Sequence, residues 1–389
     1  MFKILSLMKL ILQALLGLLI FPLSAQTAKD SSKLSDFQKR MELKALVVGR
    51  YAASFDENID FEGYHFSKDL ENDQEIVNNS FQMEYVRFAT SFYINDRIST
   101  SILLNLANFN NESVSRKVLE NAFVQYKANP YFTIRLGQFR PYFGLEDLHP
   151  FQLNNSYRWS NQYFLFGQNA WQSFQIGAAV YGELSEKNIP LKYYFTVYNG
   201  NNRNQSQDND NNKNYSLRFE VLPLDILQIG INGAITNKHH QNANAYGADL
   251  KITYPISKTW EIDAHMEYKR GTNFTAYNEA LATGILTNNL KLNDFYMEGI
   301  YNLLRAKKYL NLPYLKALEF SIRQEYLDTN SQVNGDILRS HIPMISLVLA
   351  GDYDAKLSLV GVFYDYQTNI ENTSQYDSTR ALIQFQVAF

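Results

Sequence analysis

The last ten residues of the chain, RALIQFQVAF at positions 380–389, alternate between two kinds of side chain. One face carries Ala381, Ile383, Phe385, Val387 and Phe389; the other carries Arg380, Leu382, Gln384 and Gln386, with Leu382 as the exception. Alternation over about ten residues is typical of a transmembrane β-barrel strand, whose outer face meets lipid and whose inner face meets water. We therefore predict that residues 380–389 close such a barrel. Because a terminal aromatic residue is common in outer-membrane proteins, Phe389 is expected to contact the assembly machinery.

Candidate strands with the same period of two recur along the chain, and we predict about 16 of them in one antiparallel barrel. They are Leu43–Tyr51, Phe81–Tyr93, Ile98–Leu106, Leu119–Tyr126, Phe132–Gly137, Trp171–Tyr181, Leu191–Tyr198, Tyr215–Val221, Leu227–Ile235, Tyr246–Tyr254, Glu261–Lys269, Phe295–Tyr301, Leu318–Tyr326, Ile342–Leu349, Lys356–Tyr364 and Ser378–Phe389. In Glu261–Lys269 every residue on the polar face is ionisable. So dense a charged face favours a water-filled lumen over the outer surface of a soluble sandwich.

The N-terminal segment has the form of a secretory signal. Lys3 and Lys9 precede an apolar run that ends at Phe21, and small residues follow as far as Ala25. A basic start, a short apolar core and a small-residue exit predict cleavage, after Ala25 or alternatively after Ala28. We expect a signal peptide at 1–25, a periplasmic arm at 26–40 and an undivided barrel domain at 41–389.

The composition supports this assignment and excludes several functions. The chain has 27 Tyr and 26 Phe, enough for aromatic girdles at both membrane surfaces, and no Cys, which excludes disulfide scaffolds and thiol catalysis. After residue 25 no apolar run reaches the length of about 18 residues that a membrane-spanning helix needs. The net charge is −3, and loss of the two signal lysines would make it −5, which offers no basic tail for nucleic acid.

The connections between the predicted strands alternate in length. Short ones, such as 95–97 and 255–259, lie between long ones, such as 52–80, 138–170, 199–214, 270–294 and 327–341; residues 302–317 are a longer exception that we expect to include a helical turn. In outer-membrane barrels the long loops lie outside and the short turns lie in the periplasm. The third outer loop, 138–170, is the longest, and we expect it to fold into the lumen and narrow the channel, because a barrel of about 16 strands is otherwise open. The alternative is that it caps the barrel or packs on a neighbouring subunit.

The start of this loop carries a recognisable motif. Residues 135–146 read RLGQFRPYFGLE. This segment resembles the characteristic segment of the porin O and P family, the phosphate-selective porins, in which a strand is followed by Gly-Gln-Phe, a basic residue, Pro and Phe-Gly-Leu-Glu. The chain departs from that pattern by one extra residue, Tyr142, before Phe143.

The resemblance implies a 16-stranded, homotrimeric outer-membrane porin of a Gram-negative bacterium, with a narrowed pore lined by Arg and Lys that passes phosphate-like anions. Arg140 matches the basic residue of the motif. The candidate anion-lining residues are Arg135, Arg140, Arg158, Lys251 and Arg323, and the candidate constriction acids are Glu146 and Asp147. Lys251 and Arg323 share strand faces with acids, so a salt-bridge network along the inner wall is the competing interpretation, and cation against anion preference stays open.

Other constellations are weaker. Asp208, Asp210 and Asn212 have the spacing of calcium ligands, but Lys213 stands where a calcium loop has glycine. His239-His240 lacks a third ligand nearby. His65 and Ser67 have the spacing of a barrel phospholipase pair, but lie in an expected loop with no third group to fix the base. We therefore predict passive diffusion of small hydrophilic solutes or ions, with phosphate or other anions as candidates, and no enzyme activity, metal or cofactor. Alternative functions are a structural or adhesive barrel with a blocked lumen, or a barrel hydrolase.

Overall fold

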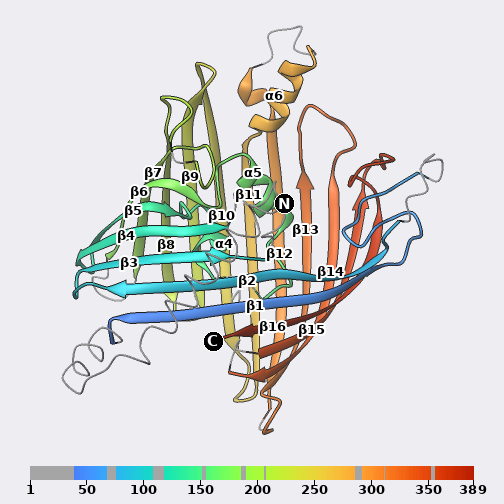
Figure 1. The fold of residues 1–389 in the computed structure, drawn as a ribbon, viewed down its shortest axis with the longest axis horizontal. Helices are drawn as coiled ribbons and strands as arrows, with labels where there is room; N and C mark the ends of the chain where they lie inside the picture. The colour runs from blue at the N-terminus through green and yellow to red at the C-terminus, as the bar shows by residue number, and fades with distance from the viewer. Residues whose placement is uncertain are drawn as a thin grey trace, which may run out of the picture.

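The computed structural model forms one closed antiparallel β-barrel (Figure 1). The residues that the structure describes are 39–67, 76–107, 118–150, 155–184, 190–205, 207–284, 291–310, 312–351 and 355–389. The expected signal peptide and most of the expected arm therefore lie outside the described residues. Each strand pairs with its sequence neighbours, and β1 pairs with β16 to close the barrel.

Sixteen strands build the wall, in the order of the chain. They are β1 (Met41–Ser54), β2 (Asn79–Tyr93), β3 (Ile98–Asn105), β4 (Leu119–Asn129), β5 (Phe132–Phe139), β6 (Gln175–Leu184), β7 (Leu191–Tyr198), β8 (Asn214–Leu224), β9 (Leu227–Lys238), β10 (Gln241–Pro255), β11 (Trp260–Thr272), β12 (Tyr296–Tyr309), β13 (Ala317–Asp328), β14 (Leu338–Ala350), β15 (Ala355–Tyr366) and β16 (Ser378–Ala388). The short helices α4 (Leu145–Leu148) and α5 (Asn161–Gln168) follow β5, and α6 (Phe274–Ala282) and the 3-10 turn η2 (Leu292–Asp294) follow β11. No helix among the described residues is long and apolar enough to cross a membrane.

The predicted strand number is confirmed, while several strand boundaries are corrected. Strand β12 continues to Tyr309, so the expected helical turn at 302–317 is wrong and only 310–316 remain as a connection. Strand β6 begins at Gln175, which leaves Trp171 in the third loop. Strands β9 and β10 are longer than predicted, and only His239 and His240 connect them. Both residues have positive φ (52° and 59°), as a type I′ hairpin turn requires. One outer connection is therefore short.

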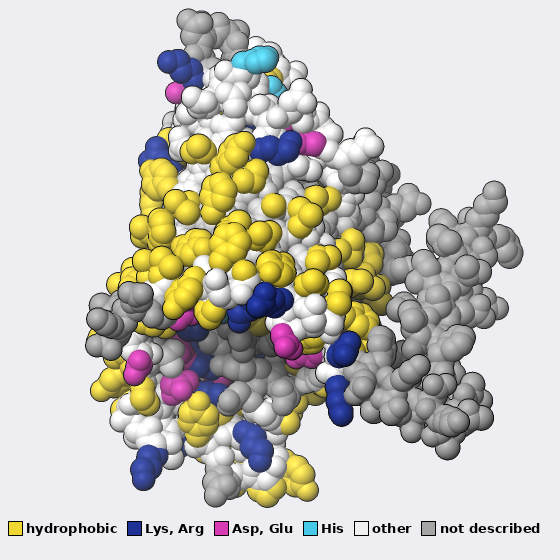
Figure 2. Space-filling view, turned by 90° about the vertical axis from the view of Figure 1, so that its left-hand side faces the viewer, with side chains coloured by type: hydrophobic (Ala, Val, Ile, Leu, Met, Phe, Trp, Pro, Cys, Tyr) yellow, Lys and Arg dark blue, Asp and Glu magenta, His cyan; other side chains and the backbone are white. Residues whose placement is uncertain are grey.

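The two faces of the wall separate by polarity as the sequence pattern requires. In β16, Ile383 is 52% exposed on the outside, whereas Gln384 is 3% exposed inside. Figure 2 shows the result as a broad band of hydrophobic side chains, with a hollow below it rimmed by Lys, Arg, Asp and Glu. The outer band is the surface that hydrocarbon covers, because its side chains are apolar. The wall can stand in lipid because a closed barrel pairs every backbone N–H and C=O group within itself.

The inner wall also has an apolar section, which explains the exception in the last strand. Leu382 faces inward and packs in a buried cluster contributed by β1, β12, β14 and β15 and by the third loop. The cluster contains Ala52, Tyr157, Tyr301, Leu303, Ile342, Met344, Val360, Val362 and Leu382. One side of the lumen is thus filled by packed side chains, and water-accessible space must lie elsewhere in the barrel.

Candidate functional site

The motif at 135–146 turns the chain from the wall into the lumen. Gly137 has φ 132°, and a Cβ there would lie 2.2 Å from the Ala122 carbonyl oxygen, so only glycine fits. The carbonyl oxygen of Pro141 accepts hydrogen bonds from the hydroxyls of Thr196 (3.0 Å) and Ser216 (3.2 Å). These bonds fix the start of the third loop against β7 and β8.

The extra residue of the motif has its own conformation. Tyr142 has φ 63°, in the left-handed region, and its ring packs 4.7 Å from that of Tyr194 and 5.5 Å from that of Tyr181. A left-handed residue reverses the backbone direction within one position, so the insertion is absorbed locally. Phe143 is then free to enter the lumen, where it is fully buried.

The loop next attaches to the opposite wall. The Glu267 carboxylate on β11 accepts hydrogen bonds from the Leu145 N–H (2.7 Å) and from the Gln162 side chain (3.0 Å). The Glu325 carboxylate on β13 accepts the Asn161 N–H (2.9 Å) at the start of α5. The expectation that the third loop folds inward is therefore confirmed, and α4 and α5 lie within the outline of the barrel in Figure 1.

A hydrophobic core holds the end of the loop in place. Phe166 and Trp171 are fully buried against inward-facing alanines of β9 and β10. The Trp171 ring stacks on Phe274 of α6 (centroids 5.2 Å apart), and its Nε1 donates to the Thr272 carbonyl oxygen (2.8 Å). The sequence assigned Trp171 to a strand because its apolar neighbours follow the strand period; in the structure it anchors the loop.

The two expected constriction acids bind the loop to itself. Glu146 accepts hydrogen bonds from the Ser160 N–H (2.9 Å) and from the Ser160 hydroxyl. Asp147 accepts the N–H groups of Phe143 (3.0 Å) and Ser173 (3.4 Å). Burial raises the pKa of each carboxyl to about 7, because water no longer solvates the charged form.

Open space remains between the loop and the wall of β1 to β4. A cavity of about 870 Å³ is bounded on the loop side by Trp159, Tyr163 and Phe164. The wall side carries the charged residues Arg50, Glu84, Arg87 and Glu120, and the connection between β7 and β8 adds Arg203. Each of these five charges is close to a partner: Arg50 lies 2.6 Å from Glu84, and Glu120 lies 2.8 Å from Arg87 and 3.4 Å from Arg203.

The structure distributes the five predicted basic residues over the lumen. Arg140 donates to the Glu146 carbonyl oxygen (2.9 Å) and packs on Trp159, at the edge of the cavity. Arg158 packs on Phe164 with its guanidinium carbon 4.9 Å from the ring centre, and its charge interacts with Glu84. Each of these two arginines thus packs on an aromatic side chain that lines the cavity.

The other three lie farther away. Arg135 stacks on Phe123 at 4.0 Å and bonds to Gln125 and Tyr181. Arg323 is fully buried, ion-paired to Glu325, and donates to Ser156 and to the Arg158 carbonyl oxygen. Lys251 faces inward on β10 beside His265 of β11 and has no hydrogen bond or ion pair among the described residues.

Sequence reasoning missed the cavity wall itself. Arg87 and Glu120 sit on the polar faces of predicted strands, but nothing in the alternation distinguishes them from other inward charges. The choice between inward positions depends on which part of the wall the third loop leaves uncovered. That depends on contacts between residues more than 100 positions apart, such as that between Leu145 and Glu267.

The weaker constellations hold no ligand set. Asp208 forms an ion pair with Lys213, and His239 contacts Asn278 at 3.1 Å. No group of three His, Cys, Asp or Glu side chains suited to a metal occurs in the described part of the chain. The His65 ring stacks on Tyr376 (3.8 Å), and the Ser67 N–H donates to the Asn372 side chain. Both residues therefore belong to the packing between the first and last outer loops.

A closed barrel of 16 strands with an inward third loop and a charged cavity defines the class of outer-membrane porins. The chain matches the phosphate-selective porin O and P family over residues 58–281, more than half of its length. It belongs to that family, and it is a channel for small solutes in the outer membrane of a Gram-negative bacterium. Comparison with curated proteins gives no match.

Solved structures show the same fold at low sequence identity. The outer membrane channel DcaP of Acinetobacter baumannii is 12% identical, with TM-score 0.54 over 90% of this chain and 97% of that one. The anion-selective porin from Comamonas acidovorans is 9% identical, with TM-score 0.53 over 90% and 99%. The trimer form of OmpT from Vibrio cholerae is 9% identical, with TM-score 0.52 over 90% and 99%.

Proposed function

We propose that the channel passes small hydrophilic solutes through the cavity between the third loop and β1 to β4, with a weak preference for small anions such as phosphate. The observation that supports this is the position of the cavity: the loop is bound to the opposite wall, and this side stays open. Diffusion needs only a hydrated path, and selectivity follows from the charges along it.

The charge balance argues for weak rather than strong selectivity. Among the lining residues, Arg50, Arg87 and Arg203 are offset by Glu62, Glu84 and Glu120. Arg140 and Arg158 add positive charge at the loop edge, while the Glu146 and Asp147 carboxyls are buried behind it with raised pKa. The excess of guanidinium groups therefore attracts anions modestly, and the paired charges keep the path polar for neutral solutes.

Planar-bilayer recording tests this function. Purified protein should give discrete conductance steps and, in a tenfold salt gradient, a reversal potential displaced slightly toward the anion limit. Arg158→Glu should move the potential toward the cation limit, whereas Lys44→Glu, at an exposed position on the short-turn end of β1, serves as the matched control. A cation-selective wild type, or a potential unmoved by Arg158→Glu, contradicts the proposed anion preference, and the absence of steps contradicts the open path.

We further propose a homotrimer, as in the trimer form of OmpT, surrounded by outer-membrane lipid and inserted by assembly machinery that reads Phe389. Residues 1–25 would be removed on export, which the mass of the mature protein checks. We propose no catalysis: lipid hydrolysis should be absent from wild type and from Ser67→Ala alike.

A further inference from the structure

The outward face of β14 carries a residue that is unusual in the interior of a strand. Pro343 lies in the interior of β14, although proline cannot donate to the ladder and normally avoids central strands. The register on either side, His341 with Phe363 and Met344 with Val360, places Gly361 of β15 opposite Pro343. Glycine in a strand weakens it and often marks a site where a ligand approaches closely.

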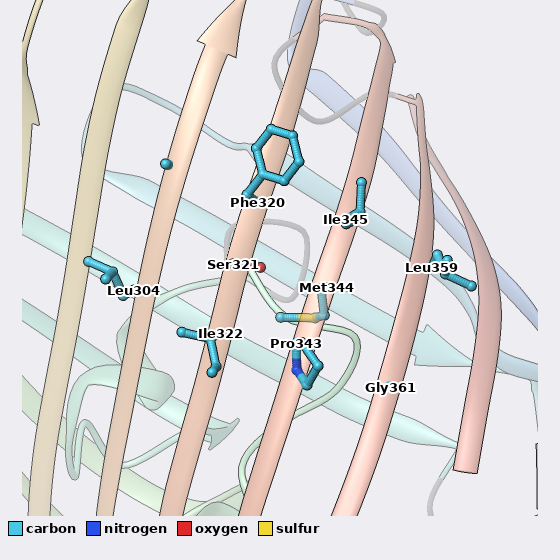
Figure 3. Close-up of a pocket in the computed structure, with 10 residues that line it drawn as sticks. Leu304, Phe320, Ser321, Ile322, Pro343, Met344, Ile345, Leu359 and Gly361 are labelled. Carbon is cyan, nitrogen blue, oxygen red and sulfur yellow. The ribbon is translucent and has the colours of Figure 1, made fainter.

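Together these two residues make a groove in the hydrophobic band. It has a volume of about 480 Å³ and crosses four strands, β12 to β15. Figure 3 shows Leu304, Phe320, Ile322, Ile345 and Leu359 around it, with Pro343 and the bare backbone of Gly361 at its floor. A Cβ at Gly361 would lie 3.1 Å from the Phe363 ring and 3.4 Å from Pro343, so even a small side chain begins to fill the floor.

Basic side chains lie directly above the groove on the same outward face. His341 and Arg339 are two and four residues from Pro343 toward the long-loop end, about 7 and 14 Å along the strand. Arg339 is half exposed and lies 3.8 Å from Asp365, a loose ion pair that leaves most of its five N–H donors free for another acceptor. An apolar slot below exposed basic groups is complementary to a lipid with a negatively charged head and acyl chains.

A second groove on the same band provides an internal comparison. It has a volume of about 570 Å³ between β16, β1 and β2, and is lined outside by Gly49, Tyr51, Phe81 and Phe385. Toward the long-loop end the outward positions of these strands are Ala53, Asn79 and Thr379, none of them charged. The second groove does include Arg50 in its lining, but this arginine belongs to the inward face of β1 and is ion-paired to Glu84 (2.6 Å). Outward-facing basic residues on the long-loop side therefore accompany only the β12–β15 groove of these two.

We propose that the β12–β15 groove binds one phosphorylated glycolipid of the outer leaflet, the lipid A part of lipopolysaccharide. One acyl chain lies over Pro343 and Gly361, and a phosphate is held by Arg339 with His341 beside it. The Asp365 carboxylate repels the phosphate and competes with it for Arg339. The bound lipid can therefore exchange with free lipid. A pair of large side chains in place of Pro343 and Gly361 would close the groove.

Native mass spectrometry tests this site on the full chain purified from outer membranes in a mild detergent. Bis-phosphorylated lipid A is titrated in competition with phosphatidylethanolamine, and heat-dependent gel mobility verifies that each variant is folded. Wild type should hold one lipid A per barrel. Pro343→Ile with Gly361→Val should lower the affinity at least about tenfold, equivalent to about 1.4 kcal/mol, while folding as well as wild type because the ladder bond is restored.

A charge-reversal variant beside the groove and control variants elsewhere on the barrel distinguish lipid A from other possible occupants. Arg339→Glu should lower lipid A binding without affecting phosphatidylethanolamine, whereas Gly49→Val in the second groove and Lys44→Glu should leave both unchanged. Equal lipid A binding by the filled variant would overturn the site, and equal binding of the two lipids by wild type would overturn the role of the negatively charged phosphomonoester, because phosphatidylethanolamine carries a phosphate without net negative charge. If filling the groove instead dissociates an oligomer into monomers, the occupant is a second copy of the chain and the proposal is wrong.

Discussion

At the scale of single residues, the buried carboxyls of the third loop make stability depend on pH. Glu146 has a pKa of about 7 in the folded barrel against an ordinary value of 4.5, so folding takes up a proton between these values. Because the carboxyl pKa is raised, the free energy of unfolding rises as the pH falls from about 8 toward 4.5. Above that range the carboxyl is charged, and burying the charge lowers the free energy of unfolding.

We therefore expect the unfolding midpoint of the barrel to be higher at pH 5.5 than at pH 8. Glu146→Gln removes one of two similar titrations, since the Asp147 pKa is also about 7, and should remove about half of the difference. The measurement is the temperature of the gel-mobility transition at each pH. An unchanged difference in the variant would show that Glu146 does not titrate in this range.

Individual residues also mark the limit of what the sequence could predict. Alternation places Gln384 inside and Ile383 outside correctly, because period two is a local property of the chain. It could not separate Arg323, which anchors the loop, from Arg158, which lies at the cavity, since both are arginines in polar surroundings. The distinction depends on which wall the loop touches.

At the scale of elements, the third loop crosses the lumen and is held by specific hydrogen bonds to the wall. Its first attachment is the pair of hydroxyl bonds from Thr196 and Ser216 to Pro141. Thr196→Val with Ser216→Ala leaves the buried carbonyl without these donors, at a cost of about 1–3 kcal/mol.

The expected result is a less rigid loop start, seen as increased noise in the open-channel current at unchanged mean selectivity. Thr236→Val is the matched control, because its hydroxyl makes a comparable bond to the Lys213 carbonyl oxygen (3.0 Å) away from the cavity. Equal noise in both variants would show that Pro141 is held by other contacts.

The hairpin turn between β9 and β10 is a second element with a clear test. His239 and His240 both adopt positive φ, which costs non-glycine residues free energy that Asn-Gly avoids. Replacing both by Asn-Gly should raise unfolding stability by about 1 kcal/mol with conductance unchanged. A loss of stability would indicate that the contact of His239 with Asn278 outweighs the backbone strain.

The sequence recovered all the strands but shortened several, for a physical reason. The segments that were missed do not follow the apolar-out, polar-in pattern: β10 turns Ala243 and Ala245 inward, and β12 carries Leu303 on its inner face beside Leu304 on its outer face. Backbone pairing continues there without a side-chain signal. The type I′ turn was missed because two histidines do not resemble the usual Asn-Gly.

At the scale of the whole molecule, the two ends of the chain complete the wall. Ala45 and Phe389 exchange backbone hydrogen bonds, with N–O distances of 2.6 and 3.0 Å. Phe389→Ala keeps both bonds and removes only an outward, 75% exposed ring. We expect it to lower the amount of barrel assembled in cells several-fold while refolding in detergent stays near the wild-type yield; equal losses in both would assign the ring to stability instead.

The closure of β1 on β16 also governs the order of events in folding. The seam joins positions more than 300 residues apart, as Leu46 opposite Ala388 shows, and contacts of such separation form slowly. Until they form, a partly built sheet has two open edges that hydrocarbon cannot satisfy. The chain must therefore be completely synthesised and exported before its first strand, already paired with β2, gains its second neighbour, so a chain that lacks β16 keeps an open edge in the membrane.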